Sequence, residues 1–339
     1  MLQDFNERFK STTGSRYFLS AGNRAEVEEY LNEKDFLIPG EEVLAIMPAG
    51  EGNMNVTLRV LSSRRRFIVK QSRPWVARFP ELDAPVERIL IERSFYQAIA
   101  RNRFLTGHMP EILRCDAENF AIIMEDLGPA DDLSSIYGTD RSLGKKQLAT
   151  LLQFASELHG LTVEAFPPNR LLKALNHAQI FELPFQAGNN FPLDAIYPGL
   201  AAVARPYQHD ARLKAVVSEL GAIYLNEGSQ LIHGDFYPGS FLNVDDRVHV
   251  IDAEFAHRGR AEFDIGVLMG HLLMSRANGK RIHQIDTDYR KPAGYDDDLA
   301  RRFCYLEIMR RIIGIAQLPL SLTLDERKHL LERARAGLV

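Results

Sequence analysis

Alternating apolar and polar positions in the first part of the chain predict a small sheet. Short runs of this kind, separated by turn residues, are typical of strands whose alternate side chains face one side of a sheet. They occupy residues 43–47, 54–61, 67–71, 111–115 and 120–124. The lead-in of residues 1–40 predicts one helix, at 24–32, and another helix follows Pro85, at 86–102.

From residue 142 onward the apolar positions recur every three to four residues, which predicts helices. The helical segments are 142–159, 210–226, a segment opened by Asp264, and 297–317. Residues 166–208 are rich in Pro, Phe, Asn and Gly and predict irregular backbone with short helices, whereas the polar stretch 279–295 predicts a loop. We therefore expect an α+β protein with an N-terminal lobe of residues 1–125 and a larger helical lobe of residues 126–339.

Composition and charge exclude several classes of protein. The 339 residues are 45% hydrophobic and 25% charged, which is typical of a globular chain. A formal net charge of −4, without a basic stripe or a base-stacking motif, argues against nucleic acid as a partner. No apolar run reaches transmembrane length and no signal peptide is evident, so we expect no membrane partner and a cytoplasmic location. Cys115 and Cys304 predict reduced thiols, and the sequence leaves a homodimer open.

The candidate chemistry is concentrated in residues 231–266. Two short apolar runs end in acidic motifs there: His-Gly-Asp, which ends at Asp235, and Asp-Ala-Glu, which runs from Asp252 to Glu254. Asp252 follows Asp235 by 17 residues, enough for a loop and a hairpin that bring the carboxylates together, and Ser240 lies between them. Phosphoryl transfer needs one carboxylate to orient or deprotonate the attacking hydroxyl and others to hold the metal on the phosphates. Single acids are often only turn residues, but this spacing favours a catalytic site.

This segment resembles the aminoglycoside-phosphotransferase and choline-kinase-like superfamily, whose catalytic loop reads His-Gly-Asp. Within it the chain is most similar to the methylthioribose kinase family, in Gly-Ser at Ser240, in Asp-Ala-Glu-Phe-Ala from Asp252, and in a following Phe-Asp-Ile-Gly. The resemblance covers nearly the whole chain. It implies a two-lobed protein-kinase-like fold, ATP and Mg²⁺ as cofactors and a small-molecule sugar or alcohol as acceptor. It also implies that Asp235 is the base and that Asp252, Glu254 and Ser240 hold the metal.

A glycine-containing turn separates the first two predicted strands. Glycine allows backbone N–H groups to approach phosphates closely, although most such turns have no ligand. Kinase-like folds begin with a hairpin of this kind, and Gly-Asn-Met-Asn resembles the Gly-Asn-Leu-Asn of methylthioribose kinases. The resemblance therefore implies that Gly50, Gly52 and Asn53 bind ATP.

Two further elements of the first lobe are candidates for nucleotide binding. Lys70 ends the third strand, where the lysine of a kinase reaches the phosphates and is held by a Glu of the next helix. We predict Glu92 as that partner, because the helix dipole alone explains the alternative, Glu87, in the first turn. By resemblance, the exit of the last strand contacts adenine through its backbone; this set comprises Met124, Glu125 and Leu127.

Two arginines near the end of the last predicted helix are candidates for substrate binding. Arg310 falls on the apolar stripe of residues 297–317, and a buried cation needs an anion or a ligand. Arg311 lies four residues after Glu307, so its simplest interpretation is a surface ion pair. The segment also resembles the Arg-Arg-Ile-x-Gly of methylthioribose kinases, whose arginines contact the sugar. We therefore predict a substrate site formed by Asp235, Arg310 and Arg311.

Two other polar residues have structural interpretations. His159 ends a predicted helix and resembles the Leu-His-Gly helix end of the superfamily. Asp264 is interpreted either as an N-terminal helix cap or, by resemblance, as a brace of the catalytic loop. Neither is placed in the catalytic set.

The predicted function is ATP-dependent phosphorylation of a ribose-type sugar, with 5-methylthioribose of methionine salvage as the first candidate. The chain departs from that family in Phe-Tyr-Pro after His-Gly-Asp, which concerns the methylthio pocket more than the kinase chemistry. One alternative is a superfamily kinase for another 5-modified pentose, an amino alcohol or an aminoglycoside. Cationic acceptors call for an acidic pocket, which the arginine pair opposes. The other alternative is a nucleotide-binding pseudokinase module without turnover.

Overall fold

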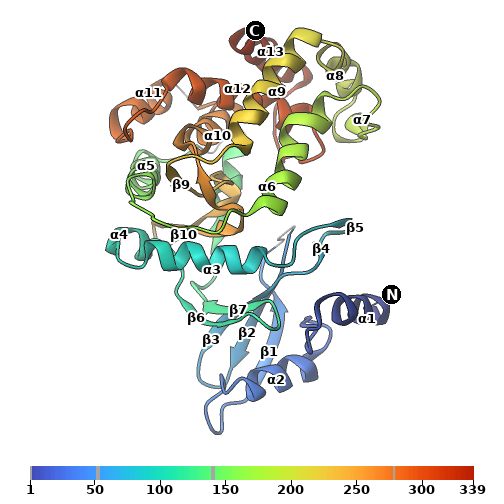
Figure 1. Ribbon diagram of the computed structural model, residues 1–339, viewed down its shortest axis with the longest axis vertical. Helices are drawn as coiled ribbons and strands as arrows, with labels where there is room; N and C mark the ends of the chain where they lie inside the picture. The colour runs from blue at the N-terminus through green and yellow to red at the C-terminus, as the bar shows by residue number, and fades with distance from the viewer. Residues whose placement is uncertain (1, 51–53, 139–141, 278) are drawn as a thin grey trace. The chain divides into compact units, whose positions relative to one another are not determined.

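The computed structural model describes residues 2–50, 54–138, 142–277 and 279–339. It divides into two compact units (Figure 1), one of Met1–Ala100 with Met109–Pro129 and the other of Arg101–His108 with Ala130–Val339. The first contains an antiparallel sheet and the second is mainly helical. The predicted α+β class is therefore confirmed.

The sheet of the first unit has the order β1-β2-β3-β7-β6, and every neighbouring pair is antiparallel. Helix α2 packs on one face of the sheet and α3 on the other. Side chains along β3 alternate between these two faces. Val69 belongs to the core beneath α2, whereas Ile68 packs with Ile89 of α3. Lys70 shares the face of Ile68 and so points toward α3. The bounds are α2 Arg24–Glu33, β1 Val43–Pro48, β2 Val56–Ser62, β3 Arg66–Gln71, α3 Arg88–Ile99, β6 Ile112–Asp116 and β7 Ala121–Glu125.

Three features of the first unit differ from the expectation. The prediction of a single lead-in helix is wrong, because α1 (Leu2–Thr13) precedes α2 and buries Phe9 against Phe18 and Trp75. A short hairpin of β4 (Trp75–Val76) and β5 (Phe79–Asp83) occupies the segment between residues 71 and 86, for which no element was predicted. Helix α3 is also shorter than expected.

The second unit contains two small sheets, one of two strands and one of three, that present the loops of residues 231–266. Strand β9 (Gln230–Ile232) pairs with β12 (His257–Gly259), and β10 (Phe241–Val244) pairs with β11 (Arg247–Val250) and β8 (Asp131–Asp132). The longer helices are α5 Lys145–His159, α6 Arg170–His177, α8 Leu200–Gln208, α9 Ala211–Leu225, α10 Ala261–Met274, α11 Gly279–Asp288, α12 Asp297–Ile313 and α13 Leu324–Leu338. Helices α4 (Arg103–Thr106) and α7 (Leu193–Ile196) are short.

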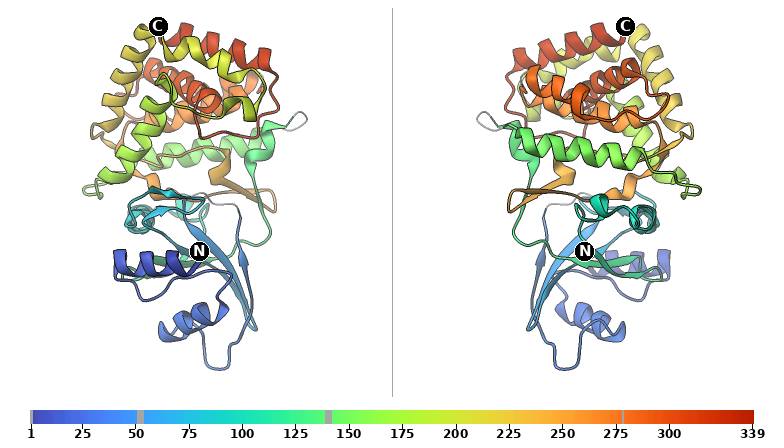
Figure 2. Two further views of the ribbon diagram at one scale, coloured as in Figure 1. Left: turned by 90° about the vertical axis from the view of Figure 1, so that its right-hand side faces the viewer. Right: turned by 90° about the vertical axis from the view of Figure 1, so that its left-hand side faces the viewer.

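Helices α10 and α12 lie side by side in the centre of the second unit (Figures 1 and 2). Two glycines spaced one turn apart on α10 allow this approach. A Cβ atom on Gly266 would lie 2.6 Å from the Ala300 carbonyl oxygen, and one on Gly270 would lie 3.0 Å from that of Cys304. Substituted side chains there would push α12 away from α10.

The prediction of a loop at residues 279–295 is wrong, because α11 occupies Gly279–Asp288. Its polar composition hides a helical pattern in which Ile282, Ile285 and Tyr289 recur at steps of three and four, and the last two are buried. Helix α12 ends at Ile313 rather than at residue 317, and α13 was not anticipated. Among the described residues, no helix is long and apolar enough to cross a membrane.

Candidate active site

Helix α10 holds the loop that follows β9 through the side chain of Asp264. Asp264 accepts hydrogen bonds from the backbone N–H groups of His233 (2.7 Å) and Gly234 (3.0 Å) and lies 3.1 Å from His159 Nε2. Burial alone would raise the pKa of Asp264, but the bonds from His159 and His233 outweigh it and lower the pKa. The N-terminal cap of α10 is Arg260, so the interpretation of Asp264 as a cap is wrong and the brace is what the contacts show. His159 is buried and structural, as predicted.

Gly234 is required by the turn that presents Asp235. Its φ angle is +81°, and an added Cβ atom would lie 2.3 Å from the Phe255 carbonyl oxygen. The loop thus passes directly against the segment that carries Glu254, and only glycine permits both the backbone conformation and the contact. The two acidic motifs are joined at this point.

The Asp235 side chain is partly buried, with 27% of its surface exposed. Burial raises its pKa to about 6, and the neighbouring carboxylates Glu307 and Asp252 act in the same direction. Arg311 and Arg310 oppose this shift. At neutral pH the carboxyl is ionised yet more basic than an ordinary aspartate, which suits a group that accepts a proton.

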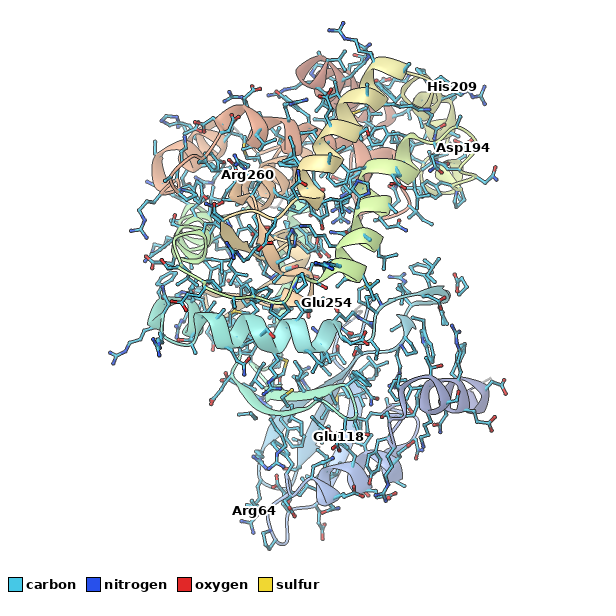
Figure 3. All side chains as sticks on the ribbon, viewed as in Figure 1. Arg64, Glu118, Asp194, His209, Glu254 and Arg260 are labelled. Carbon is cyan, nitrogen blue, oxygen red and sulfur yellow. The ribbon has the colours of Figure 1, made fainter. Side chains whose placement is uncertain are left out.

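Three oxygen-bearing side chains could hold a divalent metal ion beside this loop. Antiparallel pairing of β10 with β11 places Ser240 next to Ile251, whose N–H bonds the Ser240 carbonyl at 3.0 Å, and Asp252 follows directly. Asp252 adopts a left-handed conformation (φ +63°), and Glu254 is buried in the next turn (Figure 3). Asn169 fixes that turn by donating to the Glu254 carbonyl at 2.9 Å.

The donor chemistry of this set fits Mg²⁺. Two carboxylates and a hydroxyl are hard oxygen ligands, and Mg²⁺ is usually held by one or two carboxylates together with substrate phosphates and water. Within the part of the chain that the structure describes, no group of three or more His, Cys, Asp or Glu residues could hold a metal by itself. The Ser240 hydroxyl donates a hydrogen bond to the backbone carbonyl of Asp235 at 2.8 Å. The lone pairs of the Ser240 hydroxyl oxygen can therefore still bind a metal ion.

Arg310 and Arg311 are both buried and both bind one carboxylate of their own helix. Arg310 Nε donates to Glu307 Oε2 at 2.5 Å and Arg311 Nε to Glu307 Oε1 at 2.8 Å. The surface-pair interpretation of Arg311 is wrong, because its side chain is 8% exposed. Arg311 Nη2 also lies 3.9 Å from Asp235 Oδ1, and its guanidinium lies 4.8 Å from the ring of Tyr237. The structure therefore brings both predicted arginines to the Asp235 side of α12.

Glu307 and Tyr237 are the residues of this site that the prediction missed. The spacing of Glu307 to Arg310 and Arg311, three and four residues, was a signal for a shared carboxylate on one helical face. Tyr237 gave no such signal, because its position over Arg311 depends on the meeting of α12 with the loop after β9.

In the first unit, Lys70 Nζ lies 2.7 Å from Glu92 Oε2, and both side chains are buried. Glu87, the alternative partner, is the cap residue that precedes α3. Gly50 has a φ angle of +80° with open space where a Cβ would stand, whereas Gly52 and Asn53 lie outside the described residues.

Asp126 makes hydrogen bonds that hold the segment after β7. Asp126 is buried, accepts from Arg59 Nε at 2.9 Å, and accepts the Gly128 N–H at 3.0 Å. Its neighbours Met124, Glu125 and Leu127 are buried, exposed and half-buried respectively. Their contact with adenine stays a prediction.

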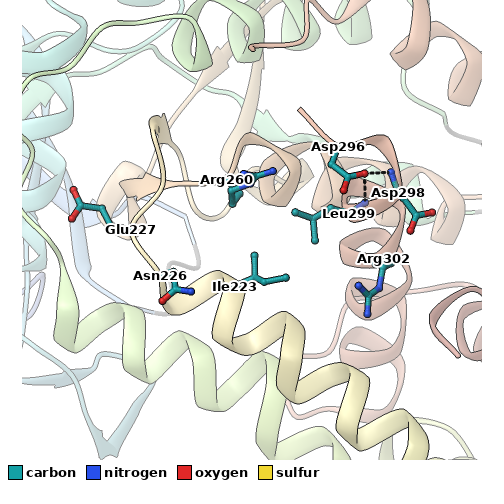
Figure 4. A pocket seen from close by; sticks show the side chains of 8 residues that line it. All are labelled: Ile223, Asn226, Glu227, Arg260, Asp296, Asp298, Leu299 and Arg302. Atoms are coloured by element: carbon teal, nitrogen blue, oxygen red, sulfur yellow. Dashed lines mark hydrogen bonds between the residues drawn. The ribbon is translucent and has the colours of Figure 1, made fainter. Parts of the chain in front are cut away.

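A cavity of about 430 Å³ lies elsewhere in the second unit, between the end of α9 and the start of α12 (Figure 4). Its charged groups already have partners: Arg260 binds Glu262 at 2.7 Å, and Asp296 accepts the N–H groups of Asp298 and Leu299. Arg302, the cavity residue of α12 that is nearest to Arg311 in the chain, precedes it by nine residues, or about 13 Å along the helix axis. We therefore place the candidate active site at the other end of α12.

Fold and site together define a kinase-like phosphotransferase. The chain belongs to the phosphotransferase enzyme family, whose model matches residues 57–303. A choline kinase from Streptococcus pneumoniae has the same fold, with a TM-score of 0.53 at 15% identity over 93% of this chain and 99% of that one. A spectinomycin phosphotransferase solved with ADP and spectinomycin gives a TM-score of 0.52 at 13% identity over 94% and 98% of the two chains. The predicted kinase-like fold is confirmed.

Relatives by sequence are methylthioribose kinases. The one from Exiguobacterium sibiricum is 26% identical, over 88% of this chain and 87% of its own length. Methylthioribose kinase 1 of Oryza sativa is also 26% identical, but the match spans 69% of this chain and only 57% of the rice protein. The chain is an enzyme, a kinase that phosphorylates a hydroxyl group of a small molecule.

Proposed function

We propose that this kinase transfers the γ-phosphoryl group of ATP to a hydroxyl of a ribose-type sugar, with 5-methylthioribose as the acceptor. The relatives support the sugar, since they are named methylthioribose kinases at 26% identity. The observation that carries the proposal is the pair of buried arginines, Arg310 and Arg311, beside Asp235. Guanidinium groups donate hydrogen bonds and attract electron-rich oxygens, so the site suits a neutral polyhydroxy acceptor.

In the proposed mechanism Asp235 orients the acceptor hydroxyl and accepts its proton. Its raised pKa of about 6 makes it a stronger base than an exposed aspartate while it remains ionised at pH 7. Asp252, Glu254 and Ser240 would hold Mg²⁺, which neutralises charge on the phosphates when bound. Lys70, fixed by Glu92, would hold the nucleotide phosphates together with the turn at Gly50. Positioning and charge neutralisation supply most of the rate in such a transfer.

The alternative acceptors are cationic amino alcohols and aminoglycosides. Solved structures of the same fold include a choline kinase and a spectinomycin phosphotransferase. A cationic acceptor next to Asp235 would meet the positive charge of Arg311 at close range, which disfavours its binding. A pseudokinase module is disfavoured by the presence of Lys70, Asp235, Asp252 and Glu254 together.

The test is ATP consumption at saturating Mg²⁺ with methylthioribose, ribose, 5-deoxyribose, choline, homoserine and kanamycin. Turnover with methylthioribose that Asp235→Asn abolishes supports the proposal. Turnover with choline or kanamycin instead would overturn the assignment of a sugar acceptor. ATP binding without turnover on any acceptor would favour the binding module.

A further inference from the structure

A buried chain of hydrogen bonds ends at the candidate acceptor site. Tyr137, in the turn Leu133–Tyr137, has its hydroxyl 2.6 Å from His271 Nδ1, and His271 Nε2 lies 2.8 Å from Glu307 Oε1. All three side chains are buried. They come from three separate elements, so the chain links the start of the second unit, α10 and α12.

The direction of each bond in this chain is determined by chemistry. Burial would raise the pKa of Glu307, but Arg310 and Arg311 outweigh it and hold the pKa well below the ordinary value. An ionised carboxylate only accepts, so His271 must carry its proton on Nε2 and donate it to Glu307. Burial lowers the pKa of His271 to about 4, so the ring is neutral at pH 7 and its other nitrogen, Nδ1, accepts from the Tyr137 hydroxyl. His271 is thus a neutral imidazole in one defined tautomer.

Glu307 divides its two oxygens between two arginines. Arg310 Nε binds Oε2 and Arg311 Nε binds Oε1, the oxygen that also accepts from His271. One carboxylate and two guanidinium groups leave a single net positive charge, directed at Asp235. Arg311 is held further by a bond from Nη1 to the Ala316 carbonyl at 3.2 Å.

We propose that Glu307 is a positioning residue of the acceptor site, which holds Arg311 within ion-pair distance of Asp235 but outside hydrogen-bond distance. This inference rests on the proposed function. The 3.9 Å between Arg311 Nη2 and Asp235 Oδ1 leaves the carboxylate oxygen available to an acceptor hydroxyl. The Nη2 group keeps N–H donors for an oxygen of the same acceptor.

A purely structural role would not require this arrangement. Buried ion pairs contribute little net stability compared with apolar residues of the same volume. Without Glu307, the guanidinium of Arg311 can turn onto Asp235 and form the paired hydrogen bonds that arginine and carboxylate prefer. That movement would occupy the carboxylate oxygen and withdraw a donor from the acceptor.

Kinetics of Glu307→Gln test the role. We expect the KM for methylthioribose to rise about tenfold or more, because the acceptor loses about one hydrogen bond to a charged group. The KM for ATP should stay within about twofold of the wild-type value. Glu307→Asp keeps the charge and should recover part of the affinity. The matched control is Glu262→Gln, another buried carboxylate of this unit that binds one arginine (Arg260, 2.7 Å) and a backbone N–H. It should leave both KM values unchanged.

Two results would overturn the inference: a folded Glu307→Gln with the acceptor KM of the wild type, or equal changes in the KM for ATP and for the acceptor. If Glu307→Gln does not fold, Tyr137→Phe provides the milder variant, with an expected two- to fivefold rise in acceptor KM from one lost neutral bond. An unchanged KM in that variant would exclude coupling through His271.

A second measurement separates this inference from the proposed function. In protein with ¹⁵N-labelled histidine, His271 should show the neutral Nε2–H tautomer at pH 7, and the other tautomer or a charged ring would overturn the bond directions. If the wild-type enzyme turned over none of the acceptors, the proposed function would be overturned, but this spectrum would stay the same. If another sugar of the panel is the acceptor, its KM replaces that of methylthioribose.

Discussion

Asp264 of α10 accepts the backbone N–H of His233 at 2.7 Å, so the loop that carries Asp235 is fixed by a carboxylate of another element. The same carboxylate accepts from Gly234 and lies 3.1 Å from His159 Nε2. Three contacts from two segments meet at one buried charge. The position of Asp235 therefore depends on α10 and α5 as well as on its own strand.

Asp264→Asn should lower both stability and turnover. An amide offers one acceptor and places N–H₂ donors against the N–H groups of His233 or Gly234, so we expect a loss of about 2–4 kcal/mol in the free energy of unfolding. We also expect kcat to fall at least tenfold, since the loop loses its brace. Asp210→Asn is the control, because Asp210 caps α9 and binds Arg335 at the surface. Urea unfolding and steady-state kinetics measure both, and an Asp264→Asn enzyme with the kcat of the wild type would contradict the prediction.

Asp235→Asn should lower turnover by orders of magnitude and stabilise the protein. The folded state raises the pKa of Asp235 from 3.8 to about 6, so it binds the proton more tightly than the unfolded chain. Stability therefore falls as pH rises from about 4 to 6 and stays lower above that. At pH 7.5 without nucleotide or metal, removal of the charge should add about 1–3 kcal/mol to the free energy of unfolding. We expect kcat to fall by about 10²–10⁴.

The control for that variant is Asp245→Asn. Asp245 is exposed in the turn between β10 and β11 and has a φ angle of +47°, which asparagine tolerates. Its unfolding free energy and kcat should match the wild type. An Asp235→Asn protein that is less stable than the wild type at pH 7.5 would contradict the prediction that the buried charge of Asp235 destabilises the folded state.

Local pattern sufficed for the parts of the site that lie on single elements. Lys70 was chosen because it ends the third predicted strand, where kinase-like folds have a lysine, and Glu92 was preferred to Glu87 because the helix dipole alone explains an acid in the first turn. The motifs ending at Asp235 and Glu254 marked two loops because each follows an apolar strand. These residues are where the expectation put them; their functional roles stay predictions.

Tertiary contacts explain what the sequence left out. Helix α11 is stabilised by contacts with α5, where Gln284 donates to the Lys145 carbonyl at 3.0 Å, and its short apolar pattern was outweighed by its polar composition. The link of Tyr137 to His271 joins residues far apart in the chain. The predicted recognition of adenine by the backbone of Glu125 and Leu127 would leave no side-chain pattern, so this prediction depends on the family resemblance alone.

Glu92→Gln should weaken ATP binding without affecting the acceptor. Lys70 Nζ and Glu92 Oε2 are 2.7 Å apart and buried, so the neutral amide removes the charge that orients the lysine. We expect the KM for ATP to rise about tenfold, with the KM for the acceptor unchanged. The control in the same unit is Glu41→Gln, a buried carboxylate that binds Arg65 Nε at 3.1 Å. Both variants should lose stability, but only Glu92→Gln should change the KM for ATP. The same KM for ATP in both variants would contradict a nucleotide-binding role of Lys70 and Glu92.

His271 should make the folded state sensitive to acid. Burial lowers its pKa to about 4, with Arg311 and Arg310 acting in the same direction and Glu307 opposing. The unfolded chain titrates near 6.5, so the stability that this neutral ring contributes is present above pH 6.5 and is lost as pH falls toward 4. The buried His257, also lowered to about 4, adds a second proton over the same range. Each proton is worth about 1.4 kcal/mol per pH unit.

Urea unfolding between pH 6 and pH 4.5 measures this slope, and the Asp235→Asn background removes the opposite contribution of that carboxylate. In that background His271→Gln should reduce the slope by about 1.4 kcal/mol per pH unit, because one fewer proton is taken up on unfolding. The exposed His209→Gln serves as the control and should leave the slope as it was. A His271→Gln protein with an unchanged slope would mean that the ring is already charged in the folded state, contrary to the lowered pKa of His271.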